Sequence, residues 1–422
     1  MGSMSTTDIA SMQIEGIQEL IPELLKSETT LDALFEDNGR SQRVGTIAFR
    51  IVVKHAKPAT YKFSGLDGPA LPVGGGSKWD KGSITPVVLM LPVGWTKLTE
   101  MVGVKVDGVA IANAVEETMA DAVDNLRTIR DQLLNTEGTG KLGVVLSVNG
   151  FTVTMAPATT YGFGARLLNE GQTIGIWNGN TLRGSVTIDQ KPFDTVGGTQ
   201  SYHFSGTDPG TSPGDFVRCD GLISGAPVSI NGLSSFINTS ISGTLLGFTK
   251  ANCSYMVSNG YDLGGGQITL PAARLLITQV QGRLGKKALK GQIWHTHPSQ
   301  VAAYEELGFE RQEIETMGEY KKMDLLFEDF SLGSFPITPN NNADQTAWTF
   351  LQPKSWGKVH FGGDGPFFYE MPGAGKIYPL YDAASGAPLT QFGACLVDAK
   401  QYYCDNVLGQ GVITSCRVPT GN

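Results

Sequence analysis

Apolar residues recur with a helical period near the start of the chain. Residues 7–36 place them every three or four positions, with a break at Pro22, as an amphipathic helix does. The polar positions of this arm, Asp32 among them, are acidic and face a single basic residue, Lys26. Because no helix adjacent in sequence could cover the apolar stripe, we expect the arm to lie on a partner. The stripe comprises Ile9, Met12, Ile14, Ile17, Leu20, Ile21, Leu24 and Leu25.

The pattern changes to that of strands after Gly45. Residues 46–63 and 83–98 read as two strands, and the Gly- and Pro-rich residues 64–82 between them read as a tip. Proline occurs in both strands, and within sheets proline is confined to edges and bulges. We therefore expect a long hairpin that extends away from the body of the protein.

A long helix is predicted next. Apolar residues recur every three or four positions over residues 108–134, which indicates one continuous amphipathic helix. The Gly-rich residues 135–140 (NTEGTG) are expected to end it as a C-cap and turn. This turn does not match a phosphate-binding loop, because Asn135 replaces the first glycine and Leu142 replaces the Ser or Thr that would hold magnesium.

Short alternating runs separated by Gly, Asn, Asp and Pro dominate residues 143–260. Strands at this spacing are typical of a small barrel or sandwich, here inserted into the main body. A second helix is predicted over residues 270–289, and the chain is expected to end in two short strands around the turn at 408–411. The apolar positions of the second helix are Leu275, Ile277, Val280 and Leu284.

The composition favours self-association over binding of nucleic acid. The chain has 422 residues, of which 54 are glycine and only 17% are charged, and its net charge is −8. A neutral, loop-rich surface predicts burial against copies of the same chain, whereas sequence-independent DNA binding needs a concentrated basic face. Five cysteines without C-x-x-C spacing are expected to be reduced, as in a cytosol, and no run of 18 apolar residues could span a membrane.

The stretch HTHP, residues 295–298, raises the question of a metal site. It resembles the zinc-binding core of the JAMM metalloproteases, but Glu306 and Phe309 stand where that family has its downstream Ser and Asp. A catalytic zinc site needs three protein ligands, and two imidazoles do not suffice. We therefore expect a strand end followed by a helix with Pro298 in its first turn, and no metal, cofactor or enzymatic activity.

The order of these elements resembles the major capsid proteins of tailed bacteriophages, which have the Hong Kong 97-like fold. An arm, an extended hairpin (the E-loop), a long spine helix and a turn similar to N-G-D-G-T-G follow one another in that family's order, as do the later helix, the strand-then-helix at HTHP and the final strand. The resemblance implies an α+β fold with peripheral and axial domains, to which this chain adds the inserted β-rich domain.

On this resemblance we divide the chain into six parts. They are the N-terminal arm (1–42), the E-loop hairpin (43–98), the spine helix and peripheral domain (99–149), the inserted β-rich domain (150–230), the axial domain (231–390) and the C-terminal strands that return to the body (391–422).

The resemblance also implies a function. It predicts a structural virion protein that assembles in the bacterial cytoplasm, as hexamers and pentamers, into an icosahedral or prolate shell. The shell would enclose packaged double-stranded DNA without binding it specifically. Expected partners are a scaffolding protein, a portal and a decoration protein, with no membrane contact.

Three sets of residues are expected at contacts between subunits. The E-loop set is Tyr61, Phe63, Leu66, Leu71, Val73, Lys78, Trp79 and Lys81. The arm set is Ile14, Ile17, Leu20 and Leu24. The loops expected near the capsomer axis contain Asn340, Asn341, Asn342, Trp348 and Trp356, with the asparagines alternatively forming only turns.

Other functions remain as alternatives. An encapsulin-like compartment would share the fold, a JAMM-like zinc hydrolase would use the histidines, and a carbohydrate-binding module would use the inserted domain. Some capsid proteins cross-link an E-loop lysine to an asparagine of a neighbour. We do not expect that bond here, because residues 376–394, where the acceptor would fall, contain no asparagine.

Overall fold

The computed structural model describes residues 30–35, 42–44, 48–58, 75–96, 114–156, 163–190, 192–194, 200–219, 229–305, 331–360, 366–370, 376–381 and 388–418. Within them, helices and strands are mixed along the chain in an α+β arrangement. The stripe residues of the predicted arm lie outside the described residues, but its end is a short helix, α2 (Thr30–Leu34). None of the described helices is long and apolar enough to cross a membrane.

The longest strand, β22 (Pro388–Cys404), forms the centre of the peripheral sheet. β4 (Val87–Thr96) pairs antiparallel with one edge of β22. Three strands pair in turn with β22 through its other edge: β19 (Trp356–His360), β20 (Phe367–Phe368) and β21 (Tyr378–Tyr381). The prediction of two short terminal strands is therefore wrong for the first of them, because these successive partners support a strand of 17 residues.

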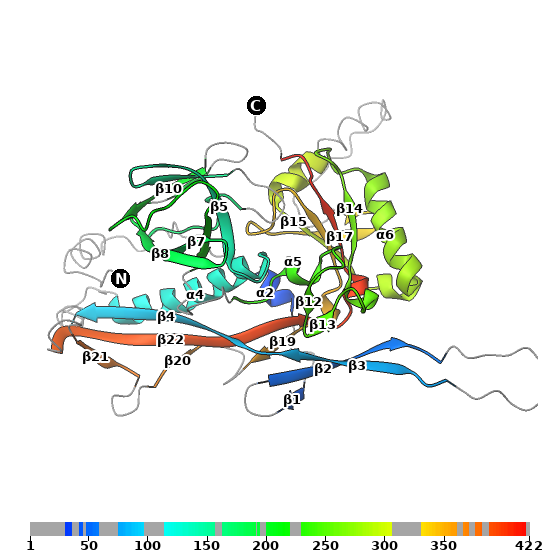
Figure 1. The fold of residues 1–422 in the computed structure, drawn as a ribbon, viewed down its shortest axis with the longest axis horizontal. Helices are drawn as coiled ribbons and strands as arrows, with labels where there is room; N and C mark the ends of the chain where they lie inside the picture. Colours follow the sequence, from blue (N-terminus) through cyan, green and yellow to red (C-terminus); the bar gives the residue numbers. More distant parts are fainter. Residues whose placement is uncertain are drawn as a thin grey trace, which may run out of the picture.

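The long helix α4 (Ala114–Leu134) lies along β4 and β22 (Figure 1). Its described part confirms the predicted stripe, since Ala122 and Leu126 are buried against Leu396 of β22. The helix ends at the Gly-rich turn, as predicted. Gly138 there has φ +84°, a left-handed conformation that favours glycine.

The predicted hairpin is confirmed for β2 (Ala48–Ala56) and β3 (Lys78–Ile84), but most of the predicted returning strand, residues 87–96, is β4, which pairs with β22. β2 pairs antiparallel with β3, β1 (Gln42–Val44) pairs with the other edge of β2, and the ribbon runs out beyond the body in Figure 1. The returning strand begins earlier than predicted, because β3 starts at Lys78, inside the segment assigned to the tip. Lys78, Trp79 and Lys81 therefore belong to a paired strand.

The β-rich region after α4 forms a closed sheet, as the alternating runs predicted. Six strands follow in the order β6-β5-β11-β7-β8-β10, and β10 pairs back to β6, with β9 added at the side of β10. The strands are β5 (Lys141–Asn149), β6 (Thr152–Met155), β7 (Thr173–Asn178), β8 (Thr181–Ile188), β9 (Phe193–Asp194), β10 (Gln200–Ser205) and β11 (Phe216–Cys219).

A second sheet of six strands forms the axial region, in the order β14-β23-β18-β15-β17-β16. Its strands are β14 (Asn259–Asp262), β15 (Ile293–Thr296), β16 (Ser331–Leu332), β17 (Phe335–Pro339), β18 (Trp348–Leu351) and β23 (Gly411–Thr414). Shorter elements complete the described chain: α5 (Leu233–Phe236), β12 (Thr244–Leu245), β13 (Phe248–Thr249), η1 (Ser254–Met256), η2 (Lys286–Leu289), η4 (Pro353–Ser355) and η5 (Val407–Gly409).

The second helix, α6 (Leu270–Leu284), flanks the axial sheet and begins after the capping residue Thr269. Its existence is confirmed, and of its apolar positions named from the sequence Val280 is buried. Ala273, Leu276 and Val280 are buried, whereas Leu275 and Leu284 are exposed.

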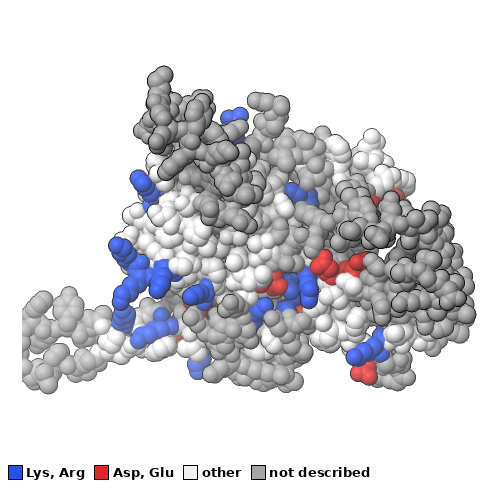
Figure 2. Space-filling view, turned by 180° about the vertical axis from the view of Figure 1, so that it is seen from behind, with Lys and Arg blue, Asp and Glu red and all other residues white. Residues whose placement is uncertain are grey.

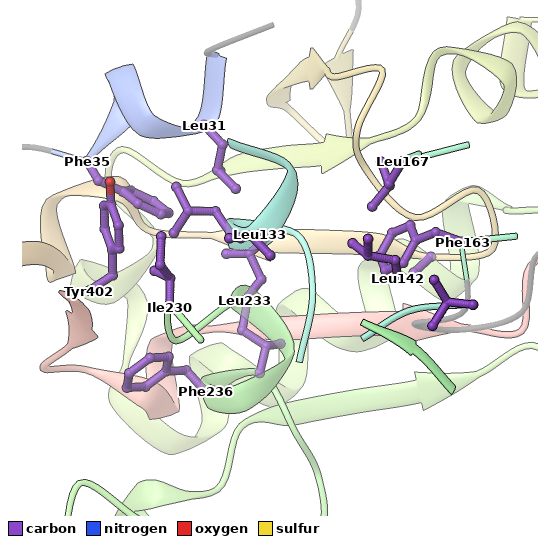
Figure 3. Packing of buried hydrophobic residues seen from close by; sticks show 14 of the residues in the cluster. Leu31, Phe35, Leu133, Leu142, Phe163, Leu167, Ile230, Leu233, Phe236 and Tyr402 are labelled. Carbon is purple, nitrogen blue, oxygen red and sulfur yellow. The ribbon is translucent and has the colours of Figure 1, made fainter. Parts of the chain in front are cut away.

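The main hydrophobic core joins the end of the arm to the body. Figure 3 shows Leu31 and Phe35 beside Leu133 of α4, with Tyr402 of β22 close to Phe35. The Phe35 ring also stacks on Trp356, with ring centroids 4.7 Å apart. This part of the arm therefore belongs to the subunit's own core.

Candidate assembly surfaces

The β2–β3 hairpin exposes large apolar side chains. Trp79 is 57% exposed and Val52 is 54% exposed. The Lys54 ammonium lies 5.1 Å from the centre of the Trp79 ring, an attraction that orients the ring without covering it. Lys78 and Lys81 are also exposed. A contact of these side chains with a neighbour stays a prediction, and Tyr61, Phe63, Leu66, Leu71 and Val73 lie outside the described residues.

The base of the hairpin is fixed to the body of its own subunit. Ile51 and Ile84 are buried in the main core, and the Ser83 N–H donates to the Leu246 carbonyl at 3.0 Å. Gly82 is required for close approach, because a Cβ there would lie 2.7 Å from the Phe248 ring. The anchored base directs the rest of the hairpin outward.

The peripheral sheet carries exposed apolar side chains on the face away from α4, on its strands β4 and β20, while Val397 of β22 between them is buried. Alternate residues of β4 point to opposite faces, so Leu89 and Leu91 pack towards α4 while Val88 and Met90 do not. In the strand register Met90 lies beside Val397, which lies beside Phe367 of β20. Val88, Met90 and Phe367 are all more than a third exposed. We call these three side chains the open sheet face.

A network of buried polar groups lies where the arm, the spine helix and the sheets meet. We call Asp32, Arg130, Asp131, Asp398 and Tyr402 the buried hub. Arg130 of α4 donates to Asp32 of the arm and, at 2.5 Å, to Asp398 of β22, while the Tyr402 hydroxyl also donates to Asp32. Asp32, which the sequence places on the polar side of the arm, is buried in the structure, where its carboxylate neutralises a buried guanidinium.

Asp131 connects the same arm segment to the axial region. One carboxylate oxygen accepts the backbone N–H groups of Leu31, at 2.9 Å, and Asp32, at 3.3 Å. The other accepts the side-chain amides of Asn340 and Asn342, each at 3.0 Å. One side chain thus holds the start of α2 and a loop more than 200 residues away.

The environment of the hub shifts its titration. Burial raises the pKa of Asp131, and the four hydrogen bonds only partly offset that effect. Burial alone would lower the pKa of Arg130, but Tyr402, Asp32 and Asp398 raise it above its usual value. Sequence patterns did not reveal the hub, because Arg130 and Asp131 occupy positions on α4 that look like an ordinary solvated face.

The residues predicted to lie near a capsomer axis are mostly internal. Asn340 and Asn342 are buried on Asp131, Trp348 is buried in β18, and Trp356 is buried against Phe35. The side chains of these four residues are enclosed by their own subunit and do not themselves line an axis, while the position of their loops near a capsomer axis stays a prediction. The turn reading is confirmed, because the Asn342 N–H donates to Asn340 Oδ1 at 2.6 Å. Asn341 is exposed, and its contact stays a prediction.

The strand-then-helix interpretation of HTHP is confirmed. His295 and His297 flank the end of β15, and residues 298–305 are helical from Pro298 onward. The His295 Nε2–H donates to Asn135 Oδ1 at 2.9 Å, while His297 Nδ1 lies 2.8 Å from the Ser299 hydroxyl. The described residues contain no group of three or more His, Cys, Asp or Glu side chains that could hold a metal ion.

We expect the buried His295 to make the stability of the folded subunit depend on pH. Burial lowers the pKa of His295 to about 4 from its ordinary 6.5. Between these values the unfolded chain binds a proton that the folded chain does not, so stability falls as pH falls from 6.5 towards 4. We expect His295→Gln to remove about 2 kcal/mol of the loss between pH 7 and 4.5, measured by urea denaturation of the unassembled subunit. An unchanged loss would contradict this assignment.

No protein-family model matches the chain, and no curated protein matches its sequence. Among solved structures, it is similar to a chain of the cyanophage A-1(L) capsid asymmetric unit, with a TM-score of 0.54 and 12% identity over 94% of this chain and 96% of that chain. The capsid of the native GTA particle gives a TM-score of 0.48 and 9% identity over 94% of each chain. The SrpI encapsulin of Synechococcus elongatus PCC 7942 gives 0.45 and 8% over 99% of each chain. The match to the cyanophage capsid chain over nearly its whole length, together with the hairpin, spine helix and two-sheet body, shows that this chain has the α+β, Hong Kong 97-like fold of capsid proteins.

Proposed function

We propose that this chain is the major capsid protein of a tailed bacteriophage, a structural protein without enzymatic activity. The observation that carries the proposal is the projecting hairpin: a Hong Kong 97-like subunit whose β2–β3 ribbon leaves the body with Trp79 and Val52 exposed. Apolar side chains on a ribbon that its own subunit does not cover are suited to burial against a neighbour.

The open sheet face is a suitable receptor for that hairpin. Val88, Met90 and Phe367 form an apolar strip on a sheet whose other face is already covered by α4. If each subunit lays its hairpin on the next, the contact is head to tail and closes into a ring. Extended elements of this kind enlarge the interface beyond the roughly 1,600 Å² of a standard complex.

The remaining contacts belong to the same proposal. The arm residues Ile14, Ile17, Leu20 and Leu24 would lie on another copy, and hexamers and pentamers would build an icosahedral or prolate shell. The net charge of −8 suits a container that encloses double-stranded DNA without gripping it. A scaffolding protein, a portal and a decoration protein are the proposed partners, with assembly in the bacterial cytoplasm and the virion as destination.

Electron microscopy of the purified full-length protein tests the proposal. Closed shells, or hexameric and pentameric rings under milder conditions, are the expected result. A protein that stays monomeric at the concentrations and salt conditions that promote shell assembly would overturn it. Shells that enclose a co-expressed enzyme and fail to form around DNA would favour an encapsulin-like compartment instead.

Because Val52 and Trp79 are exposed on the hairpin, we expect their replacement to lower the stability of the shell without lowering that of the unassembled subunit. Replacing Val52 and Trp79 together by serine should weaken each subunit contact by about 2 kcal/mol, from the apolar area no longer buried. We expect the shells to dissociate at a lower temperature while the unassembled subunit unfolds as before, both followed by scanning calorimetry.

Ile51 provides the matched control. It neighbours Val52 on β2 but is buried in the subunit's own core. Ile51→Ser should therefore destabilise the unassembled subunit itself. If the Val52 and Trp79 variant also destabilised the unassembled subunit, the hairpin would belong to its own core and the proposed contact would be wrong.

A further inference from the structure

Exposed positions of α6 and of the following η2 segment carry basic and apolar side chains. Arg274 and Leu275 are exposed on α6, Leu284 at its end, and Lys286, Lys287 and Lys290 in and after η2. We call these six residues the basic face. The buried side of α6 packs Ala273, Leu276 and Val280 into the axial core, so the helix does not use the basic face to fold.

The charge of this face differs from that of the chain as a whole. The protein carries a net charge of −8, yet residues 263–304 contain no Asp or Glu. Figure 2, seen from behind, shows Lys and Arg and no described Asp or Glu along the left-hand edge of the body, which is the α6 side of Figure 1. The ion pairs found among the described residues involve other side chains. The face therefore attracts an acidic partner.

Two exposed leucines narrow the kind of partner. Leu275, beside Arg274, is 44% exposed, and Leu284, two residues before Lys286, is 37% exposed. Because they are nine residues apart on α6, they project from opposite sides of the helix, each next to its own basic neighbour. A nucleic acid backbone is recognised mainly by charge and hydrogen bonding, and it offers aliphatic side chains little to bury against. An acidic amphipathic helix offers both carboxylates and an apolar stripe, which is how helices bind in apolar grooves.

The chain itself contains such a segment. Residues 7–28 hold five acidic residues against the single Lys26, and Glu15, Glu19 and Glu23 recur at every fourth position beside the apolar stripe. As a helix up to the break at Pro22, residues 7–21 would be about 22 Å long, and the segment precedes α2, which the hub fixes to the body. We propose that residues 7–28 of a neighbouring copy dock on the basic face. This proposal rests on the proposed function, because the shell supplies the neighbouring copy.

Binding of a labelled peptide tests the chemistry of the contact. The probe is a synthetic peptide of residues 7–28, and the receptor is the full-length protein carrying Glu15→Gln, Glu19→Gln and Glu23→Gln, so that its own arm competes less. Adding Lys286→Glu, Lys287→Glu and Lys290→Glu should weaken binding at least tenfold, from the loss of attraction and the new repulsion. Arginine at the same three positions is the control and should keep the affinity within about twofold. A peptide with Glu15→Lys, Glu19→Lys and Glu23→Lys should prefer the triple-glutamate receptor.

Other outcomes would overturn the proposal. Equal affinity for the glutamate and arginine receptors would do so, and so would binding of a 22-base-pair DNA duplex in preference to the peptide. Carbodiimide cross-linking of mixed light and ¹⁵N-labelled full-length protein identifies the copy involved, since contacts between copies give mixed-isotope products. Products within one copy alone would also refute the assignment. Because electron microscopy of the same samples reports shells independently, loss of this contact and failure of the capsid proposal remain distinguishable.

Discussion

Replacing Asp131 by alanine is expected to lower the free energy of unfolding of the subunit by about 3 to 5 kcal/mol. The carboxylate accepts four hydrogen bonds, two from the backbone of the arm segment and two from Asn340 and Asn342. Without it, four buried donors lose their acceptor. The losses do not add fully, because alanine also removes the cost of burying a carboxylate, which is the reason that the pKa of Asp131 is raised.

Urea denaturation of the unassembled subunit measures this effect. Asp121 is the matched control, since it is an exposed aspartate on the same helix, and Asp121→Ala should change stability by less than about 0.5 kcal/mol. Equal effects of the two substitutions would mean that the hub contributes no more than a surface charge. Asp131→Asn should fall between them, because its amide retains one acceptor oxygen but brings two donors to the site.

Two truncations of the arm, whose end points differ by eleven residues, are expected to have different outcomes. Removing residues 1–29 leaves α2 and the hub intact, so the subunit should unfold as before. Removing residues 1–40 also takes away Asp32 and Phe35. Loss of a buried Phe costs about 3 to 5 kcal/mol, and an unpaired buried Arg130 adds a similar amount. The sum is comparable to the whole stability of a typical domain, so this variant should fail to fold.

Circular dichroism and size-exclusion chromatography of the two truncated proteins provide the measurement. If both melt like the full chain, α2 is dispensable and the packing of Phe35 on Trp356 contributes little. If both fail, residues before Thr30 are needed for the subunit itself, which would contradict a purely intermolecular role for that part of the arm. The comparison of the two truncated proteins therefore locates the boundary between the part of the arm that packs in the subunit's own core and the part proposed to contact neighbouring copies.

The elements of the fold could be predicted where periodicity and turn chemistry agreed. The spine helix, the hairpin, the strand-then-helix at HTHP and the β-rich insertion follow from spacing of apolar residues and from glycine and proline. The lengths of the strands could be predicted less well from the sequence. β22 reaches 17 residues because successive partners pair with both its edges, and such tertiary pairing leaves no local signature.

Burial of polar and aromatic residues could be predicted less well than the elements. Asn340, Asn342 and Trp356 lie in segments with many turn residues, which suggested exposed loops, yet distant partners enclose all three. Asp32 was equally misleading, because only the position of Arg130 and Tyr402 turns an acidic arm residue into an internal one. Contacts across 98 or more residues decide these cases, and a local pattern cannot contain them.

The closed sheet at Lys141–Cys219 has a practical consequence. Its first and last strands, β5 and β11, are neighbours, and the Cys219 N–H donates to the Gly140 carbonyl at 3.1 Å where the chain enters and leaves. Foreign domains whose own ends lie close together could therefore be exchanged for this module at a single junction. The substitution would remove the hydrogen bonds from Arg166 to the Asn341 and Ala343 carbonyls, and it would take Leu142 and Val145 out of the core cluster that they share with Leu133 and Leu134 of α4. The entry and exit of this module thus form one junction, at Gly140 and Cys219, to which a foreign domain could be attached.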